Sequence, residues 1–403
     1  MSSDELKEEN TKLQKENELL RSRLIDLELK LQEAKQNEHH LAKLKALPKI
    51  DDKTVLNVTV FGGGSFGTAL AVVAARRGHN VIILVRDKEQ CKSINEQHIN
   101  PKRGWLQKYK LEPNIKCTTD IKEAVDPANT NIIIHSLPVQ VTPDFLEQNA
   151  EHIPAHIPFV CTSKGIHLGT EKLLCDVIPS ILHRTDPSQD RLLYLSGPSF
   201  AKEMMENHPV ALTIASHNME WSSYVQTALN SLFFRVYMSN DVVGVECGGA
   251  LKNPLAIGAG IAVGLGYGQS TLAAIVTRGA VEIQRMAMEL GCKNPNTLYG
   301  LSGFGDLMLT SMCELSRNRT CGYYIGKEKL SVEEAQKKVG ETVEGVATAI
   351  VTQKLMKKFG IRMPLFDALA DVLQDKLKPE EALKVVMAKT PDQEGFVMIQ
   401  DLN

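Results

Sequence analysis

The sequence predicts an α/β protein with a largely parallel sheet in its first half, a mainly helical second half, and a coiled-coil extension before both. Three observations carry this prediction. A glycine-rich turn near residue 62 joins an expected strand to an expected helix, short β-branched runs continue to about Ser239, and a leucine heptad spans the start of the chain. The length of 403 residues is also more than one compact domain usually holds.

Residues 1–47 are predicted to form the coiled coil. Leucine recurs every seven residues from Leu6 to Leu27, and Asn10 and Asn17 lie three places before a leucine of the same heptad. Leucine at d with asparagine at a favours a parallel, in-register pair of helices. A lone charged helix or a disordered tail is the alternative. The segment LPKIDDK, which starts at Leu47, is expected to be a linker.

Beyond the linker, β-branched runs alternate with segments of helical length, which predicts βα units and a largely parallel sheet. We place this domain at 54–239 and a helical substrate domain at 240–403. The expected strands are NVTVF at 57–61, NVIILV at 80–85, NIIIHS at 131–136, PFVCTS at 158–163, LLYLS at 192–196, VALTIAS at 210–216 and FRVYM at 234–238.

Composition excludes several classes of function. The net charge of −2 gives no electrostatic case for nucleic acid or an anionic membrane as the main partner. No uncharged apolar run approaches the length of a membrane span. The start, MSSDELKEEN, is acidic and lacks an apolar signal core, so the cytoplasm is the expected location. The eight cysteines form no Cys-x-x-Cys pair, which indicates reduced thiols and no metal site.

A dinucleotide site is predicted in VTVFGGGSFGTAL, where Gly62, Gly64 and Gly67 have the Gly-x-Gly-x-x-Gly spacing after a strand and at the start of a helix. The first glycine permits the tight turn, the second leaves room for the pyrophosphate, and the third lets helix and strand pack closely. The helix N-terminus, with Ser65 and Phe66, offers free N–H groups to a phosphate. The sequence therefore predicts a Rossmann-type domain.

The residues at the end of the second expected strand do not decide between NAD and NADP. An NAD site usually has an acidic residue there for the ribose hydroxyl. This chain has VRDKE, with Arg86 before Asp87, and an arginine could stack on adenine or accept a 2′-phosphate. NAD is the expected cofactor, with NADP possible.

Polar motifs follow the expected strands or lie in glycine-rich segments. CTSKGIH places Lys164 just beyond a strand, and SGPSFAKE begins at Ser196 where the next strand ends. Ligands bind at the carboxyl ends of strands in such sheets. Further motifs are GGALKN at 248–253, GFGDLMLT at 303–310 and SRNRTCG at 316–322.

In chain order, GGGSFGTALA, SKG, SGPSFAKE, GGALKN, VTRG, GFGDL and SRNR resemble the NAD(P)-dependent glycerol-3-phosphate dehydrogenases. The resemblance covers about 60–350, VEGVATA at 343–349 and RMPLFDAL extend it, and 1–47 lies outside it. It implies reversible reduction of dihydroxyacetone phosphate to glycerol 3-phosphate. A homodimer is expected, in which the coiled coil would add parallel pairing or bind a protein partner.

The resemblance also implies roles for individual residues. Lys252 matches the catalytic lysine, which polarises the carbonyl and donates the proton, and Asp306 matches an acid that would pair with Lys252 or with the terminal hydroxyl of the substrate. Asn253 would hold the substrate hydroxyl, and Thr310 would contact substrate or support Lys252. The remaining substrate contacts would be Lys164, Ser316, Arg317 and Asn318, and the remaining cofactor contacts Arg86, Lys164, Ala201, Arg317 and Glu344.

Two positions depart from the pattern. Leu272 stands where many family members have arginine or lysine. Pro254 directly follows Asn253, and because proline disfavours helix in its predecessor, a local bend of the backbone is expected there.

Three alternatives remain open. One is another Rossmann-type dehydrogenase, acting on 6-phosphogluconate or a 3-hydroxyacyl thioester. The second is a non-catalytic coiled-coil scaffold whose sheet domain senses nucleotide redox state. The third is a structural protein that uses the coiled coil to reach a partner.

Overall fold

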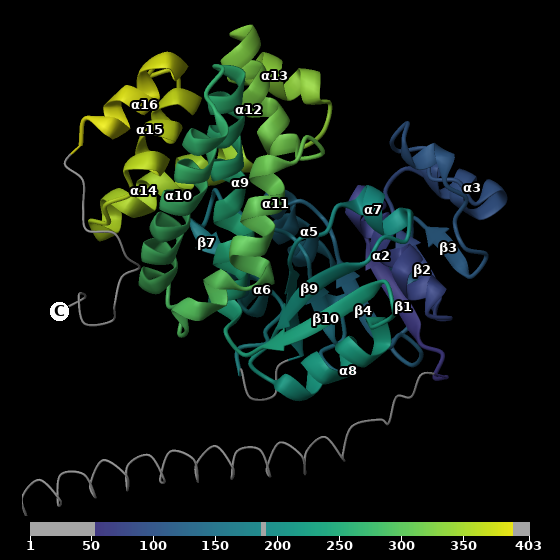
Figure 1. Ribbon diagram of the computed structural model, residues 1–403. Helices are drawn as coiled ribbons and strands as arrows, with labels where there is room; N and C mark the ends of the chain where they lie inside the picture. Colours follow the sequence, from purple (N-terminus) through teal and green to yellow (C-terminus); the bar gives the residue numbers. More distant parts are fainter. Residues whose placement is uncertain (1–52, 187–190, 390–403) are drawn as a thin grey trace, which may run out of the picture. The chain divides into compact units, whose positions relative to one another are not determined.

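The computed structural model describes residues 53–186 and 191–389. The chain divides into two units, 1–50 and 51–403, and the fold below concerns the second unit (Figure 1). The coiled coil predicted at 1–47 lies outside the described residues.

One eight-stranded sheet forms the first half of the described chain, in the order β10-β9-β8-β5-β4-β1-β2-β3. Every neighbouring pair is parallel except β8 and β9, which confirms a largely parallel sheet. The strands are β1 Asn57–Phe61, β2 Asn80–Leu84, β3 Ile115–Thr118, β4 Ile132–His135, β5 Phe159–Cys161, β8 Leu192–Ser196, β9 Val210–Ala215 and β10 Phe234–Ser239.

All seven expected strands are present, with ends that differ by at most two residues. Sequence analysis missed β3, which has four residues and is interrupted by the exposed Lys116. It also missed a small antiparallel hairpin, β6 Ile166–His167 with β7 Lys172–Leu173. Strands this short carry too little pattern to be recognised without their neighbours.

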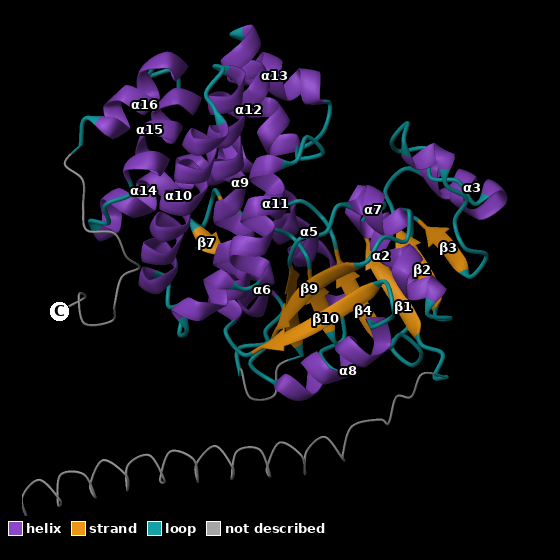
Figure 2. Ribbon diagram, in the orientation of Figure 1, coloured by secondary structure: helices purple, strands orange, loops and turns teal. Residues whose placement is uncertain are grey.

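Helices pack on both faces of the sheet (Figure 2). The first of them, α2, connects β1 to β2, and nine of its twelve residues are buried. The helices of this half are α2 Ser65–Arg76, α3 Lys88–Gln97, α4 Ile121–Ala124, α5 Thr142–Asn149, α6 Leu174–Ile181, α7 Ala201–Met205 and α8 Met219–Leu229. Short helical turns are η1 Leu106–Lys108, η2 Val139–Val141 and η3 Ala150–His152.

No described strand follows Ser239, and helices make up the rest of the described chain. The domain boundary at 239/240 itself stays a prediction. The helices are α9 Val242–Gly264, α10 Gln269–Glu289, α11 Asp306–Met312, α12 Arg317–Glu328, α13 Val332–Val339, α14 Glu344–Phe359, α15 Pro364–Leu373 and α16 Pro379–Met387, with the turns η4 Pro295–Tyr299 and η5 Leu301–Gly305.

Helix α9 is the centre of this helical half and packs against α10, α11, α12 and α14. Glycines let its backbone approach α12 closely. A Cβ on Gly260 would lie 2.0 Å from the Arg319 carbonyl oxygen, and one on Gly322 would lie 2.0 Å from the Ile257 carbonyl oxygen. The small residues that surround Lys252 in the sequence therefore serve helix packing.

The structure shows the surroundings of Pro254 and Leu272, the two positions that depart from the family pattern. The helical conformation of α9 continues through Pro254, so the expected distortion does not interrupt the helix. Leu272 is buried in α10, at 3% exposure. Among the residues described, no helix combines the length and apolar character needed to cross a membrane.

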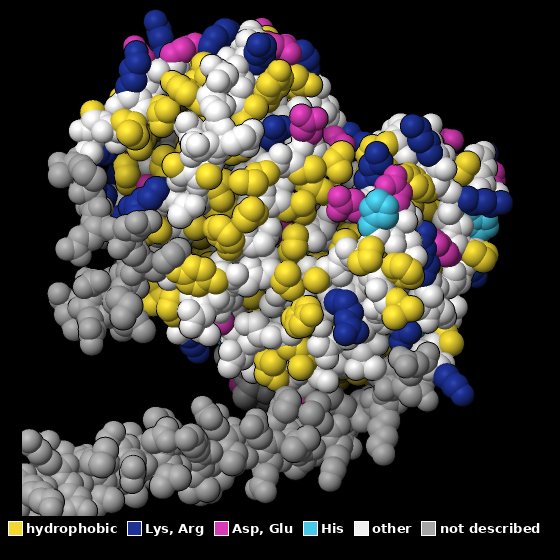
Figure 3. Space-filling view, in the orientation of Figure 1, with side chains coloured by type: hydrophobic (Ala, Val, Ile, Leu, Met, Phe, Trp, Pro, Cys, Tyr) yellow, Lys and Arg dark blue, Asp and Glu magenta, His cyan; other side chains and the backbone are white. Residues whose placement is uncertain are grey.

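The face of the molecule in Figure 3 carries basic and acidic side chains interspersed, as the small net charge leads one to expect. Hydrophobic side chains gather over α11 and the nearby end of the sheet. Exposed residues of these elements are Met308 and Met312 of α11 and Tyr237 and Met238 of β10.

Candidate active site

The glycine-rich turn between β1 and α2 is shaped by steric need. Gly62 has φ +107°, and a Cβ there would lie 2.9 Å from the Ser136 carbonyl oxygen. A Cβ on Gly67 would lie 2.1 Å from the Gly62 carbonyl oxygen. A Cβ on Gly64, in contrast, would meet no atom within 4 Å. Gly62 and Gly67 are thus required by the backbone, whereas Gly64 borders open space.

The N-terminus of α2 fits a phosphate group. No side chain caps this helix, so its first N–H groups lack an intrahelical or side-chain acceptor. The Ser65 hydroxyl is buried and has no hydrogen-bond partner within the described part of the chain. Free N–H groups, the positive end of the helix dipole and a spare hydroxyl together form an anion site. The residues present therefore fit the pyrophosphate of a dinucleotide.

Sequence analysis missed the requirement for Gly63. A Cβ there would lie 2.5 Å from Val85 Cγ1 and 2.6 Å from Gln90 Nε2. The Gly63 carbonyl accepts hydrogen bonds from Gln90 Nε2 at 2.6 Å and Asn100 Nδ2 at 3.1 Å. These partners lie just after β2, in α3 and in the loop after α3, so the local sequence motif around Gly63 does not predict them.

At the end of β2, Arg86 is exposed and Asp87 caps α3. Asp87 Oδ1 accepts hydrogen bonds from the N–H groups of Glu89, at 3.0 Å, and Gln90, at 3.3 Å. One carboxylate oxygen of Asp87 is therefore already occupied by the helix cap.

Two further predicted cofactor residues lie near the helix ends. Phe66 is in the first turn of α2, and Lys164 Nζ lies 5.9 Å from the centre of its ring. Ala201 is half-buried and begins α7, which packs against α2. The glycine-rich turn and the motif that contains Lys164 thus belong to one region.

The lysine of GGALKN lies in the middle of α9 and is buried, with 6% exposure. Its ammonium donates hydrogen bonds to Asp306 Oδ1 at 2.6 Å and to Thr310 Oγ1 at 2.7 Å. Lys164 Nζ donates to the other oxygen of the same carboxylate at 2.7 Å, and to the Gly197 carbonyl at 3.0 Å. Asp306 therefore bridges two ammonium groups, one from each half of the described chain.

Burial and charge oppose each other in this cluster. Burial lowers the pKa of Lys252 to about 8, with Lys164 and Arg317 adding repulsion and Asp306 acting against the shift. Burial alone would raise the pKa of Asp306, but the ammonium groups of Lys164 and Lys252 outweigh it and hold that pKa below its usual value. The result is an ionised carboxylate beside a lysine whose pKa is lowered to about 8.

A chain of amide contacts continues from α9 to α12 and α14. Asn253 Nδ2 donates to the Lys164 carbonyl at 3.3 Å, and Asn318 Nδ2 donates to Asn253 Oδ1 at 3.0 Å. Asn318 Oδ1 in turn accepts the Gly345 N–H at 3.0 Å. Asn253 and Asn318 are thus held in fixed orientations at the site.

Next to Gly345, Glu344 Oε1 accepts the Val139 N–H at 3.4 Å. Burial raises the pKa of Glu344, and Arg317 and Lys164 pull it in the opposite direction. Glu344 therefore lies in the field of the same positive groups as Asp306.

The motif SRNR forms the start of α12. The Ser316 hydroxyl caps the helix by accepting the Arg319 N–H at 3.2 Å, and Ser316 is 2% exposed. Arg317 donates to Glu341 Oε2 at 3.1 Å, while 48% of its side chain stays exposed. Arg317 can thus receive an anion at the helix start, whereas Ser316 already has a structural task.

Sequence analysis did not single out Glu246. This residue lies on α9, and its carboxylate accepts the Cys175 N–H at 2.7 Å. It shares a small internal pocket with Lys164, Ser196 and Gly249. Burial raises the pKa of Glu246 to about 7. An isolated glutamate in a helix gives no sequence signal for such burial.

A glycine-rich turn at the carboxyl end of a parallel strand, where the following helix can receive a phosphate, is typical of the Rossmann-type dehydrogenases as a class, and here a buried lysine paired with a carboxylate lies in the same region. Comparison with known proteins identifies the family within this class. The family model for the N-terminus of NAD-dependent glycerol-3-phosphate dehydrogenase matches residues 57–222, and that for the C-terminus matches 241–384.

Individual relatives agree. Glycerol-3-phosphate dehydrogenase [NAD(+)] 2, chloroplastic, of Arabidopsis thaliana is 41% identical over 332 residues, which is 82% of this chain and 77% of the relative. Glycerol-3-phosphate dehydrogenase [NAD(P)+] of Leptospira biflexa is 40% identical over 340 residues, 84% of this chain and all of the relative. The crystal structure of glycerol-3-phosphate dehydrogenase from Coxiella burnetii has a TM-score of 0.77 and 31% identity, and covers 83% of this chain and 99% of that one.

The chain therefore belongs to the NAD(P)-dependent glycerol-3-phosphate dehydrogenase family. It is an oxidoreductase with NAD(P) as its cofactor. The resemblance recognised in the ordered motifs is confirmed.

Proposed function

We propose that the chain catalyses the reversible reduction of dihydroxyacetone phosphate to sn-glycerol 3-phosphate, with Lys252 as proton donor and acceptor. The observation that carries the proposal is the buried pair of Lys252 and Asp306, whose atoms Nζ and Oδ1 are 2.6 Å apart. A lysine so deeply buried is costly unless it has a partner and a task. The family and its relatives supply the reaction class.

Bound NAD(P)H would supply the hydride to C2 of the ketone. The Lys252 ammonium polarises the carbonyl and donates a proton to its oxygen, and in the reverse direction the neutral amine takes that proton back. Asp306 and Thr310 hold Nζ in place through their hydrogen bonds. Because Asp306 stays ionised, it also keeps Lys252 protonated to a higher pH than burial alone would allow.

The anionic end of the substrate requires fixed donors. We assign the phosphate to Arg317 and Asn318 at the start of α12, with Lys164 adding positive charge and Ser316 shaping the turn. Support comes from the exposed fork of Arg317 and from the suitability of a guanidinium for phosphate oxygens. Asn253 would hold a substrate hydroxyl, since Lys164 and Asn318 fix its side chain.

The cofactor site is assigned to the turn that contains Gly62, Gly64 and Gly67, with Ser65 and Phe66 at the helix start. Support comes from the open space at Gly64 and the unpartnered Ser65 hydroxyl. The remaining proposed contacts are Arg86 at the adenosine end and Ala201, Arg317, Lys164 and Glu344 toward the nicotinamide.

We further propose a cytoplasmic homodimer whose residues 1–47 pair as a parallel coiled coil or bind a protein partner. The free thiols of all eight cysteines support a reducing compartment. A scaffold that only senses nucleotide is not favoured, because it has no need of a buried, carboxylate-paired lysine.

The decisive assay is NADH oxidation with dihydroxyacetone phosphate. Lys252→Ala should lower kcat by at least about 100-fold, since the proton source is lost. Lys357→Ala, which removes an exposed lysine of α14, serves as the matched control and should retain activity. Turnover of Lys252→Ala near that of the wild type would reject the assigned role, and no turnover in the wild type would reject the reaction.

A further inference from the structure

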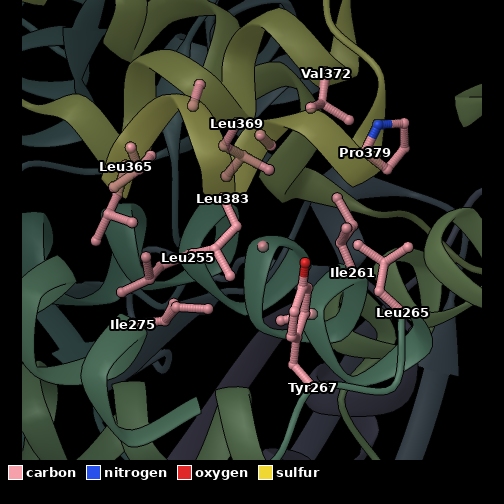
Figure 4. A pocket seen from close by; sticks show the side chains of 15 residues that line it. Leu255, Ile261, Leu265, Tyr267, Ile275, Leu365, Leu369, Val372, Pro379 and Leu383 are labelled. Carbon is pink, nitrogen blue, oxygen red and sulfur yellow. The ribbon is translucent and has the colours of Figure 1, made fainter. Parts of the chain in front are cut away.

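Outside the polar cluster, α9, α10, α15 and α16 border an apolar hollow of about 550 Å³, including its part open to solvent (Figure 4). Its walls are aliphatic, and the phenol of Tyr267 is the polar side chain among them. Six of the side chains that form it are Leu255, Ile261, Leu369, Val372, Leu383 and Val386.

Helix α16 forms one wall of this hollow, yet no residue of α16 is buried. Leu383 and Val386 face the hollow only half-covered, while Val385 is 40% and Met387 is 76% exposed. An amphipathic helix normally buries its apolar stripe against a neighbour. The hollow is therefore an apolar surface that stays partly open to solvent among the described residues.

We propose that the C-terminal segment of this same chain covers this surface, with the run Phe396 to Ile399 docked in the hollow. The last described residue is Lys389, directly after α16. Phe396 follows seven residues later, a span that reaches on the order of 25 Å when extended. The segment thus starts beside the hollow and is long enough to fold back onto it.

The composition of the segment fits the hollow. Phe396, Val397, Met398 and Ile399 are consecutive apolar residues, and acidic residues precede and follow them at Glu394 and Asp401. In an extended segment alternate side chains share one side, so two of these four can enter the aliphatic hollow while the flanking carboxylates stay in water. The match to the family model ends at residue 384, so the segment lies beyond the part shared with that model.

Docking would also reach the helix that carries the reactive lysine. Leu255, in the wall of the hollow, is three residues after Lys252 on α9. The docked segment would stabilise the C-terminal half of α9 without touching the polar cluster. This proposal goes beyond the proposed function and does not depend on it.

The direct test is photocrosslinking of the full chain with benzoylphenylalanine at position 396. Equal amounts of light and nitrogen-15-labelled protein are mixed before irradiation, and the crosslinked peptides are identified by mass spectrometry. We expect crosslinks within one chain, to α9, α15 or α16. Crosslinks between light and heavy copies would show that a second copy is the occupant and overturn the proposal, as would the absence of crosslinks to these helices.

Hydrogen exchange gives an independent measurement. Phe396→Asp places a charge in the hollow, so the amides of α16 should exchange at least about tenfold faster. The matched control is Gln400→Asp, which adds the same charge just outside the apolar run and should leave α16 unchanged. Equal exchange rates in both variants and the wild type would overturn the proposal.

Discussion

The ammonium of Lys252 and the carboxylate of Asp306 form a 2.6 Å hydrogen bond between residues that are 54 positions apart in the chain. Both are buried, at 6% and 2% exposure. The pair matters because each partner shifts the pKa of the other. The carboxylate of Asp306 raises the pKa of Lys252, which burial lowers, and the ammonium groups lower the pKa of Asp306, so that the carboxylate stays ionised.

The pH dependence of the two directions should be opposite. Reduction needs the Lys252 ammonium, so its kcat/KM should fall as pH rises through about 8, whereas oxidation needs the neutral amine, so its kcat/KM should rise through about 8. Steady-state rates from pH 6 to 10 in both directions provide the measurement. In Lys252→Arg, which stays charged throughout this range, both inflections should disappear, and their survival would assign them to another group.

Replacing Asp306 by Asn should move the reduction profile to lower pH. The substitution removes the negative charge that raises the pKa of Lys252, while burial and Lys164 continue to lower it. We expect the falling limb to shift below pH 8 and kcat at pH 7 to drop at least about tenfold. The control is Thr310→Val, which removes an uncharged partner of Lys252 and should leave the limb in place. An unshifted limb in Asp306→Asn would contradict the charge argument.

Two glycine variants should separate cofactor binding from folding. Gly64→Ala adds a methyl group where no atom lies within 4 Å, so thermal stability should be kept while the Kd for NADH rises at least about tenfold, because the phosphate approaches there. Gly67→Ala places the same group 2.1 Å from the Gly62 carbonyl oxygen and should lower the melting temperature by several degrees. Calorimetry and fluorescence titration with NADH measure both. Equal NADH affinity of Gly64→Ala and wild type would place the phosphate elsewhere.

Glu246 should make the fold less stable as pH rises. Its pKa is raised to about 7 in the folded chain from an ordinary value of 4.5, so stability present below pH 4.5 is lost as pH rises through about 7. Glu246→Gln removes this loss, and its free energy of unfolding relative to wild type should increase by on the order of 2 kcal/mol between pH 5 and pH 8. Urea unfolding at both pH values is the measurement. The exposed Glu96→Gln is the control, and an equal pH response of Glu246→Gln and wild type would show that Glu246 is not the cause.

Local chemistry made much of the fold predictable. Continuous β-branched runs marked seven strands of the sheet, because strands buried on both faces need apolar residues at every position. The glycine spacing predicted the turn at 62–67, because only glycine fits at Gly62 and Gly67, where a Cβ would clash with the backbone. Strand β3 was not predicted, because a segment of four residues that includes a lysine forms a strand only when it pairs with β2.

The sequence by itself determined seven of the ten described strands, the glycine-rich turn at 62–67 and, through ordered motifs, the family. Tertiary structure alone decided that Asp306 bridges Lys252 and Lys164, that Ser316 caps α12, and that Gly63 and Glu246 are buried. The reason is physical. A motif records the steric and hydrogen-bonding needs of its own segment, whereas burial and charge pairing depend on groups that only the folded chain brings within a few ångströms of one another.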